Sequence, residues 1–232
     1  MNLKFISKNK DKEIFEIDQF SSVSDGLVKD LMSQHKSKHL VFVPRNENFK
    51  DLDQLREQVS DRYFVQLGFT ARPEEIQQVS SEVNDHIKPV DIKPEELLDF
   101  MLSTYRESFE GKWRQYLGEE LNHQNMQFLK EHIRKEKSLV LFDQKKEKNI
   151  AMLMTFPSEY CLGEPLEQIG WVWTDQSLNE VDKKNVQALI ASWLKNQKNN
   201  LYQAGVHIHN ISSLKYFNKL GFRATCVHII EK

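Results

Sequence analysis

The sequence predicts an α/β (α+β) protein in which helices flank a mixed β-sheet. The last third of the chain alternates short runs rich in aromatic and β-branched residues with amphipathic helical segments. Two further helical segments and a strand pair around a charged turn precede it. At 232 residues, the chain is long enough for one large domain or one and a half domains.

The C-terminal elements follow the order β-α-β-α-β. Residues 167–174 ("EQIGWVWT") and 204–210 ("AGVHIHN") are predicted strands, separated by a helix over 177–197. A short helix at 212–220 and a strand at 223–232 complete the chain, and Gly221 suits the left-handed position that closes a helix. A helical crossover between the first two strands predicts that they are parallel.

The preceding segment is predicted to supply the rest of the sheet. A strand over 85–92 leads to a helix over 93–109, with Pro94 in its first turn, and to a second helix over 122–136. Strands at 137–144 and 149–160 then form a hairpin.

The phrase "YFNKLGF" at 216–222 has a near copy, "YFVQLGF", at 63–69. Around the first copy we expect a helix over 22–36, a strand over 39–46 and a helix over 49–69 that ends in the phrase. The shared order favours an internal duplication over a chance match.

This interpretation divides the chain into two units. Residues 1–75 would be a partial repeat, and residues 84–232 a complete domain. The partial unit would expose an apolar face and dock on the complete one.

The order of elements over 84–232, together with Asn210, Ser213, Phe217 and the "LGF" that follows, resembles the GNAT superfamily of acyl-CoA-dependent N-acyltransferases. The first 75 residues resemble the decayed half copy of tandem members. The expected fold is therefore a GNAT-like mixed sheet flanked by helices, plus an N-terminal partial GNAT-like repeat.

The resemblance implies acetyl-CoA as the cofactor, with its pantetheine arm between two splayed strands. The backbone at Val172, Trp173 and Thr174 would face that arm, and the start of the next helix would bind the pyrophosphate. The cofactor-binding positions implied there are Lys183, Lys184, Asn185, Val186 and Gln187, with Asn210, Ser213 and Phe217 in the following helix.

The sequence departs from the family pattern at the start of that helix. Asp182, Asn185 and Gln187 stand where the family has Arg or Gln, Gly, and Gly or Ala. Ser177 and Glu180 also form a predicted capping box, which would place a carboxylate on the amides that a phosphate needs. Lys183 and Lys184 would compensate electrostatically.

Two residues are candidates for catalysis. Glu167 is the candidate general base, and Tyr216 the candidate acid, although the family's tyrosine would correspond to Phe217. His209 is a reserve base. His207 and His209 lack a third ligand at a suggestive spacing, so we expect no metal site.

The acyl acceptor would be a small-molecule or peptide amine. Glu110, Trp113 and Tyr116 lie in the segment that would contact it. Two alternatives stay open: a catalytically inactive GNAT-fold binding module, and transfer of an aminoacyl group from a charged tRNA.

Composition limits the partners and the compartment. A formal net charge of -2 argues against nucleic acid as the main partner. We expect no membrane span, and no secretion signal in the charged N-terminal residues 1–18. Cys161 and Cys226 lie far apart, which favours a reducing, cytoplasmic setting. The sequence does not indicate an oligomeric state.

Overall fold

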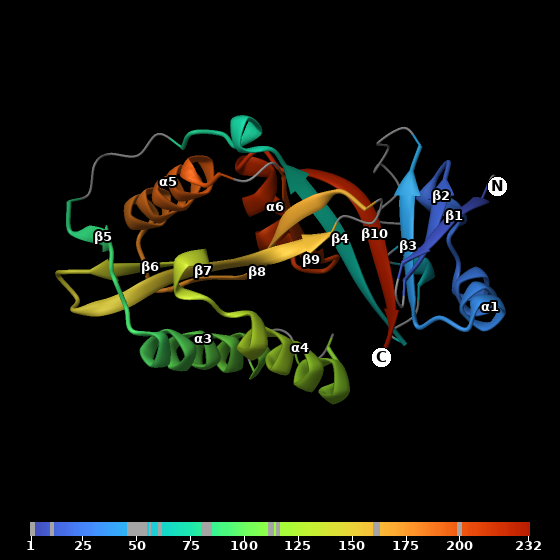
Figure 1. The fold of residues 1–232 in the computed structure, drawn as a ribbon, viewed down its shortest axis with the longest axis horizontal. Helices are drawn as coiled ribbons and strands as arrows, with labels where there is room; N and C mark the ends of the chain where they lie inside the picture. Colours follow the sequence, from blue (N-terminus) through green and yellow to red (C-terminus); the bar gives the residue numbers. More distant parts are fainter. Residues whose placement is uncertain are drawn as a thin grey trace.

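The computed structural model describes residues 3–9, 12–45, 55, 57–59, 62–79, 85–110, 114, 117–159, 163–198 and 201–232. A ten-stranded mixed sheet in the order β1-β2-β3-β10-β4-β9-β8-β7-β6-β5 runs through the molecule (Figure 1). The elements in chain order are β1 (Leu3–Asn9), β2 (Lys12–Ile17), α1 (Asp25–His35), β3 (His39–Pro44), β4 (Tyr63–Ala71), β5 (Ile87–Pro89), α3 (Pro94–Ser108), α4 (Glu119–His132), β6 (Ser138–Asp143), β7 (Lys148–Glu159), β8 (Pro165–Thr174), α5 (Glu180–Asn196), β9 (Tyr202–His207), α6 (Ile211–Lys219) and β10 (Arg223–Glu231).

The order predicted for residues 84–232 is confirmed element by element, from β5 to β10. Strands β5 to β8 are antiparallel neighbours, and β8 and β9 are parallel, as the helical crossover predicts. The helix and strand predicted at 22–36 and 39–46 correspond to α1 and β3. Local hydrophobic periodicity was sufficient to predict all of these elements, because each strand buries one face and each helix buries one stripe of apolar residues.

The prediction that residues 63–69 end a helix is wrong. "YFVQLGF" lies in β4, which is hydrogen-bonded between β9 and β10 and antiparallel to both, whereas "YFNKLGF" spans the end of α6. Most of the remainder of that predicted helix lies outside the described residues. Nearly every residue of β4 is buried, because β4 is an interior strand of the sheet.

The repeated phrase therefore does not mark the same structure twice. The proposed boundary between residues 1–75 and 84–232 stays a prediction, but β4 contributes a strand from the first segment to the interior of the sheet. Strands β1 and β2, which the sequence did not indicate, extend the sheet beyond β3.

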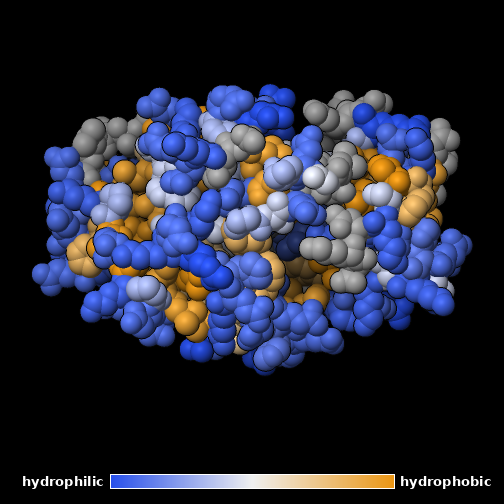
Figure 2. Space-filling view, in the orientation of Figure 1, coloured by the Kyte–Doolittle hydropathy of each residue, from blue (hydrophilic) through white to orange (hydrophobic). Residues whose placement is uncertain are grey.

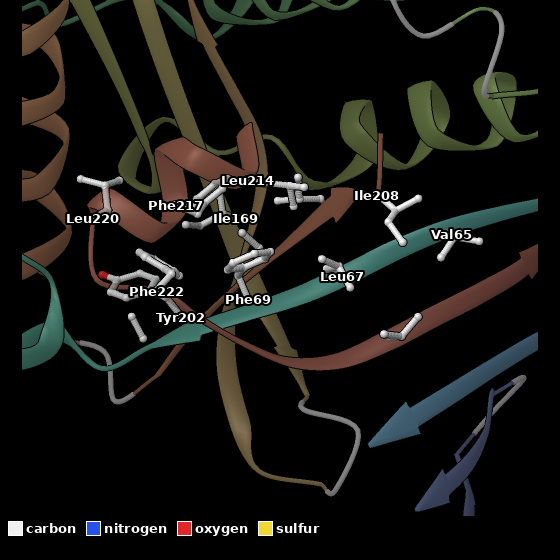
Figure 3. Packing of buried hydrophobic residues seen from close by; sticks show 14 of the residues in the cluster. Val65, Leu67, Phe69, Ile169, Tyr202, Ile208, Leu214, Phe217, Leu220 and Phe222 are labelled. Carbon is white, nitrogen blue, oxygen red and sulfur yellow. The ribbon is translucent and has the colours of Figure 1, made fainter. Parts of the chain in front are cut away.

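Helices cover both faces of the sheet (Figure 1). On one face, α5 and α6 bury the main core, to which α1 also contributes. On the other face, α3 and α4 pack over β6, β7 and β8 around a second apolar cluster. Figure 3 shows α6 packed above β4, with Phe217 facing Phe69 at 6.3 Å between ring centroids. Strand β4 thus forms part of the surface on which α6 packs.

None of the helices in the described part of the chain is long and apolar enough to cross a membrane.

Candidate functional site

The strands β8 and β9 part after a short stretch of pairing. They pair at three positions, Glu167 with Tyr202, Gln168 with Gln203, and Ile169 with Ala204. Beyond this point β8 continues along β7, and β9 continues along β4. β4 lies on the edge of β9 that faces away from β8, so it does not pair into the diverging interval.

A β-bulge coincides with the parting of the strands. The register of β7 and β8 shifts between Met154 and Thr155, which leaves Gly170 without a partner on β7. A Cβ at Gly170 would lie 2.5 Å from Cε1 of Phe156 and 3.5 Å from Cδ2 of Leu129. Only glycine fits against this core, and the bulge redirects the outer half of β8.

The outer half of β8 carries three residues predicted to face a cofactor, Val172, Trp173 and Thr174. Trp173 packs edge-to-face on Phe100 of α3, with ring centroids 5.7 Å apart. Trp171 donates its indole N–H to Oγ1 of Thr104, also in α3, at 3.0 Å. Both tryptophans are thus directed onto α3.

A hollow opens near the centre of the face shown in Figure 2, level with β9 and β4 in Figure 1, and both hydrophilic and hydrophobic residues border it.

Glu167, the candidate base, lies where β8 and β9 are still paired. Its side chain is 9% exposed, and Oε1 accepts a hydrogen bond from Nζ of Lys137 at 2.6 Å. Its Oε2 is buried and accepts no hydrogen bond from the described residues. The candidate base is therefore a buried carboxylate with one oxygen held by a cation and the other available as an acceptor.

The start of α6 is fixed by its own residues. Asn210 caps the helix: its Oδ1 accepts from the backbone N–H of Ser213 at 3.2 Å, and its Nδ2 donates to Oγ of Ser213 at 2.7 Å. Phe217 is buried in the main core. These three predicted cofactor-binding residues thus have structural roles that account for their presence.

Tyr216, the candidate acid, lies one residue before Phe217 and packs against the main core. Its hydroxyl is buried and has no hydrogen-bond partner among the described residues. Burial raises the pKa of Tyr216 well above its ordinary value, so the phenol keeps its proton.

The predicted capping box at the start of α5 is wrong. Asn179, not Ser177, caps the helix, and its Oδ1 accepts from the N–H of Asp182 at 2.8 Å. Asn179 also donates through Nδ2 to Oδ2 of Asp182 at 3.0 Å. The helix therefore begins at Glu180, two residues later than a cap at Ser177 requires.

The other residues predicted to bind pyrophosphate do not form a cationic cradle. Lys183 is paired with Glu180 at 3.1 Å, and Lys184 is exposed. Asn185 and Val186 are buried, and Gln187 is half-buried. The start of α5 thus presents acidic groups at the place where the resemblance implies a bound pyrophosphate.

One cluster at the start of α5 was missed by sequence reasoning. Nε2 of His86 lies 3.7 Å from Oδ1 of Asp182 and 3.9 Å from Oδ1 of Asp143. Asp143 is fully buried at the end of β6, and Asp182 is 4% exposed. The three residues come from distant segments and share no motif, so no spacing in the sequence could have indicated the cluster.

The remaining candidates are scattered. His207 is buried at the end of β9, stacked on Phe64, and burial together with nearby His209 and Lys232 lowers the pKa of His207 to about 3. The rings of His207 and His209 lie 5.4 Å apart, and no third metal-ligating side chain joins them among the described residues. Glu110 is exposed after α3, while Trp113 and Tyr116 lie outside the described residues.

Comparison with solved structures identifies the fold. A functionally unknown conserved protein from Staphylococcus epidermidis superposes with a TM-score of 0.52 at 13% identity, over 95% of this chain and 84% of the other. A GCN5-related N-acetyltransferase from Sphaerobacter thermophilus superposes with a TM-score of 0.50 at 10% identity, over 98% of this chain and 74% of the other. No protein-family model matches the sequence, and the search of curated proteins found no match. The likeness shows a GCN5-related N-acetyltransferase (GNAT) fold.

Proposed function

We propose that this GNAT-fold chain transfers an acyl group from an acyl thioester of coenzyme A, such as acetyl-CoA, to the amine nitrogen of a small molecule or peptide. The observation that carries the proposal is the parting of β8 from β9 at the Gly170 bulge, beside the buried carboxylate of Glu167. The arrangement combines an open strand edge, which can position a substrate, with an acceptor for the amine proton.

The two ends of the thioester cofactor meet different surroundings. Along β8 from Gly170 to Thr174, the edge not paired with β7 offers backbone N–H and C=O groups to the amides of a pantetheine arm. The start of α5 does not fit a diphosphate, because the buried carboxylates of Asp182 and Asp143 lie there. We therefore expect the nucleotide to add little affinity, and no step of the reaction depends on it.

The proposed reaction balances as a simple acyl transfer. The thioester supplies the activated acyl group, and the amine nitrogen attacks its carbonyl carbon. The C–N bond forms, the C–S bond breaks, and the amine proton passes to Oε2 of Glu167. The leaving thiolate takes up a proton, for which Tyr216 is the candidate donor, and the side chains of Glu167 and Tyr216 then exchange protons with solvent, so that both return to their starting states.

A thiol-release assay tests the proposal. The purified full chain is incubated with acetyl-CoA and a panel of amines, and free thiol is measured with the Glu167→Gln variant as the control. We expect amine-dependent thiol release that the variant lacks. Amine-dependent release at equal rates in both proteins would refute the role of Glu167, and no release with any primary amine or peptide would count against acyl transfer.

A further inference from the structure

We infer that His86, Asp143 and Asp182 form a binding site for one divalent metal ion of the zinc or manganese class. The cluster brings together the turn before β5, the end of β6 and the first turn of α5. One ligand atom from each residue lies within 4.8 Å of the others. The inference does not depend on acyl transfer.

The distances within the cluster suit a shared ion better than direct contact. The imidazole nitrogen of His86 lies 3.7 and 3.9 Å from the two carboxylate oxygens, beyond hydrogen-bond length. Ligands held about 2.0–2.2 Å from a tetrahedral ion are about 3.3–3.6 Å apart. The two distances from His86 are therefore within about half an ångström of those in a coordination sphere, and the ligand atoms of all three residues lie within 4.8 Å of one another.

The buried carboxylate of Asp143 provides a second observation, because its Oδ2 accepts no hydrogen bond from the described residues. Its side chain is fully buried, and the nearest described cation to Oδ2, Nζ of Lys146, is 3.7 Å away. Oδ1 accepts backbone N–H groups of Lys145 and Lys146 at 2.9 and 3.2 Å. A buried carboxylate is costly unless positive charge compensates it, and Lys146 is partly exposed and beyond hydrogen-bond distance, so a bound cation would add to that compensation.

Asp182 is oriented for the same role by the cap of α5. Asn179 holds Oδ2 of Asp182 at 3.0 Å, and Oδ1 is the atom closest to His86. This hydrogen bond fixes the carboxylate with Oδ1 directed towards His86. Such fixing of a ligand by a neighbouring hydrogen bond is usual in metal sites.

The ligand set determines the class of ion. One imidazole nitrogen and two carboxylate oxygens suit Zn²⁺ or Mn²⁺, whereas Mg²⁺ and Ca²⁺ prefer oxygen ligands alone. Three protein ligands also leave at least one coordination position for water or for an anionic group of a ligand.

The test is calorimetric titration of the full chain, first freed of metal by a chelator and dialysis, with ZnCl₂, MnCl₂ and MgCl₂ in separate experiments. We expect one Zn²⁺ or Mn²⁺ per chain, binding more tightly than Mg²⁺ and raising the Tm. His86→Gln and Asp182→Asn should each weaken binding at least tenfold. His123→Gln, which removes an exposed histidine of α4, is the matched control and should bind as the parent does.

Several outcomes would overturn the inference. These are the absence of Zn²⁺ and Mn²⁺ binding at 100 μM ligand, and binding that His86→Gln and Asp182→Asn leave unchanged. Binding lost equally in His123→Gln would place the ion elsewhere. Circular dichroism of each variant checks that it is folded, and because Asp143 also accepts backbone hydrogen bonds, the test relies on His86 and Asp182.

Discussion

Gly68 of β4 and Cys226 of β10 are paired residues on adjacent strands, and a Cβ at Gly68 would overlap Sγ of Cys226. The same Cβ would lie 3.1 Å from Nε2 of Gln203 on β9. The absence of a side chain at Gly68 therefore leaves room for side chains from both neighbours of β4.

Gly68→Ala should destabilise the protein by about 1–3 kcal/mol, because the added methyl group has no space beside Cys226. Denaturant unfolding measures the change. Cys226→Ala in the Gly68→Ala background should recover part of the loss, since it removes the overlapping sulfur.

Gly26→Ala is the control for that experiment. Gly26 lies in α1, where a Cβ would meet only Oγ of Ser24 at 3.9 Å, so this substitution should not destabilise. Equal costs at Gly68 and Gly26 would contradict the placement of β4 between β9 and β10.

Glu167→Gln should lower kcat for acyl transfer by about 10²- to 10⁴-fold, because the amide cannot accept the amine proton. Lys137→Gln is the matched control, since it breaks the same 2.6 Å ion pair and keeps the carboxylate. Steady-state kinetics should show activity within about tenfold of the parent for the lysine variant. Similar losses in both variants would assign Glu167 a structural role only.

Tyr216→Phe separates catalysis from stability. The substitution removes a buried hydroxyl that has no hydrogen-bond partner in the described structure, so the free energy of unfolding should stay equal or rise. If Tyr216 protonates the leaving thiolate, kcat should nevertheless fall at least tenfold. An unchanged kcat would show that Tyr216 serves only as a packing residue.

Besides His207, a pair of buried histidines should make the fold sensitive to acid. Nε2 of His39 lies 3.0 Å from Nδ1 of His228, and burial with the neighbouring His228 and Lys12 lowers the pKa of His39 to about 2. Burial, and Lys12, lower the pKa of His228 to about 3. Both rings are therefore neutral in the folded protein at pH values where they are protonated in the unfolded chain.

The direction of the pH effect follows from proton binding. Below about pH 6.5 the unfolded chain binds more protons, so the free energy of unfolding should fall as the pH falls from 6.5 towards 3, by at most roughly 1.4 kcal/mol per pH unit for each histidine. Urea unfolding at pH 7, 6 and 5 measures the slope. His228→Asn should reduce the dependence of the free energy of unfolding on pH. An unchanged slope would contradict the assignment of this pH dependence to His39 and His228.

Much of the fold could be predicted from the sequence because its elements carry local patterns. The helix α5 and the strands β6 to β8 follow their hydrophobic periods directly. The helix prediction for "YFVQLGF" was wrong because it relied on the resemblance to "YFNKLGF". The β-branched Val65, which stands where the helical copy has Asn218, favours a strand instead. Its partners in β9 and β10 are more than 130 residues away, and no local pattern specifies such pairing.

The candidate site was predictable only in part. The strand that carries Glu167 follows from its aromatic and β-branched residues, and the candidate role of Glu167 from the resemblance, but its burial and its pairing with Lys137 depend on packing between separate segments. The cluster of His86, Asp143 and Asp182 depends entirely on the way three segments meet at the start of α5. From the sequence, Asp182 could be identified only as a departure from the family pattern. Its proximity to His86 and Asp143 could not be predicted.

The measurement that tests the central claim most directly is calorimetric titration of the chelator-treated protein with acetyl-CoA and, separately, with acetyl-pantetheine. A thioester arm bound along β8, with little contribution from the start of α5, predicts that both ligands bind and that their affinities differ by less than about tenfold, or about 1.4 kcal/mol. No binding of either ligand at millimolar concentration would contradict the acyltransferase proposal. An advantage of a thousandfold or more for acetyl-CoA would instead contradict our interpretation of the start of α5.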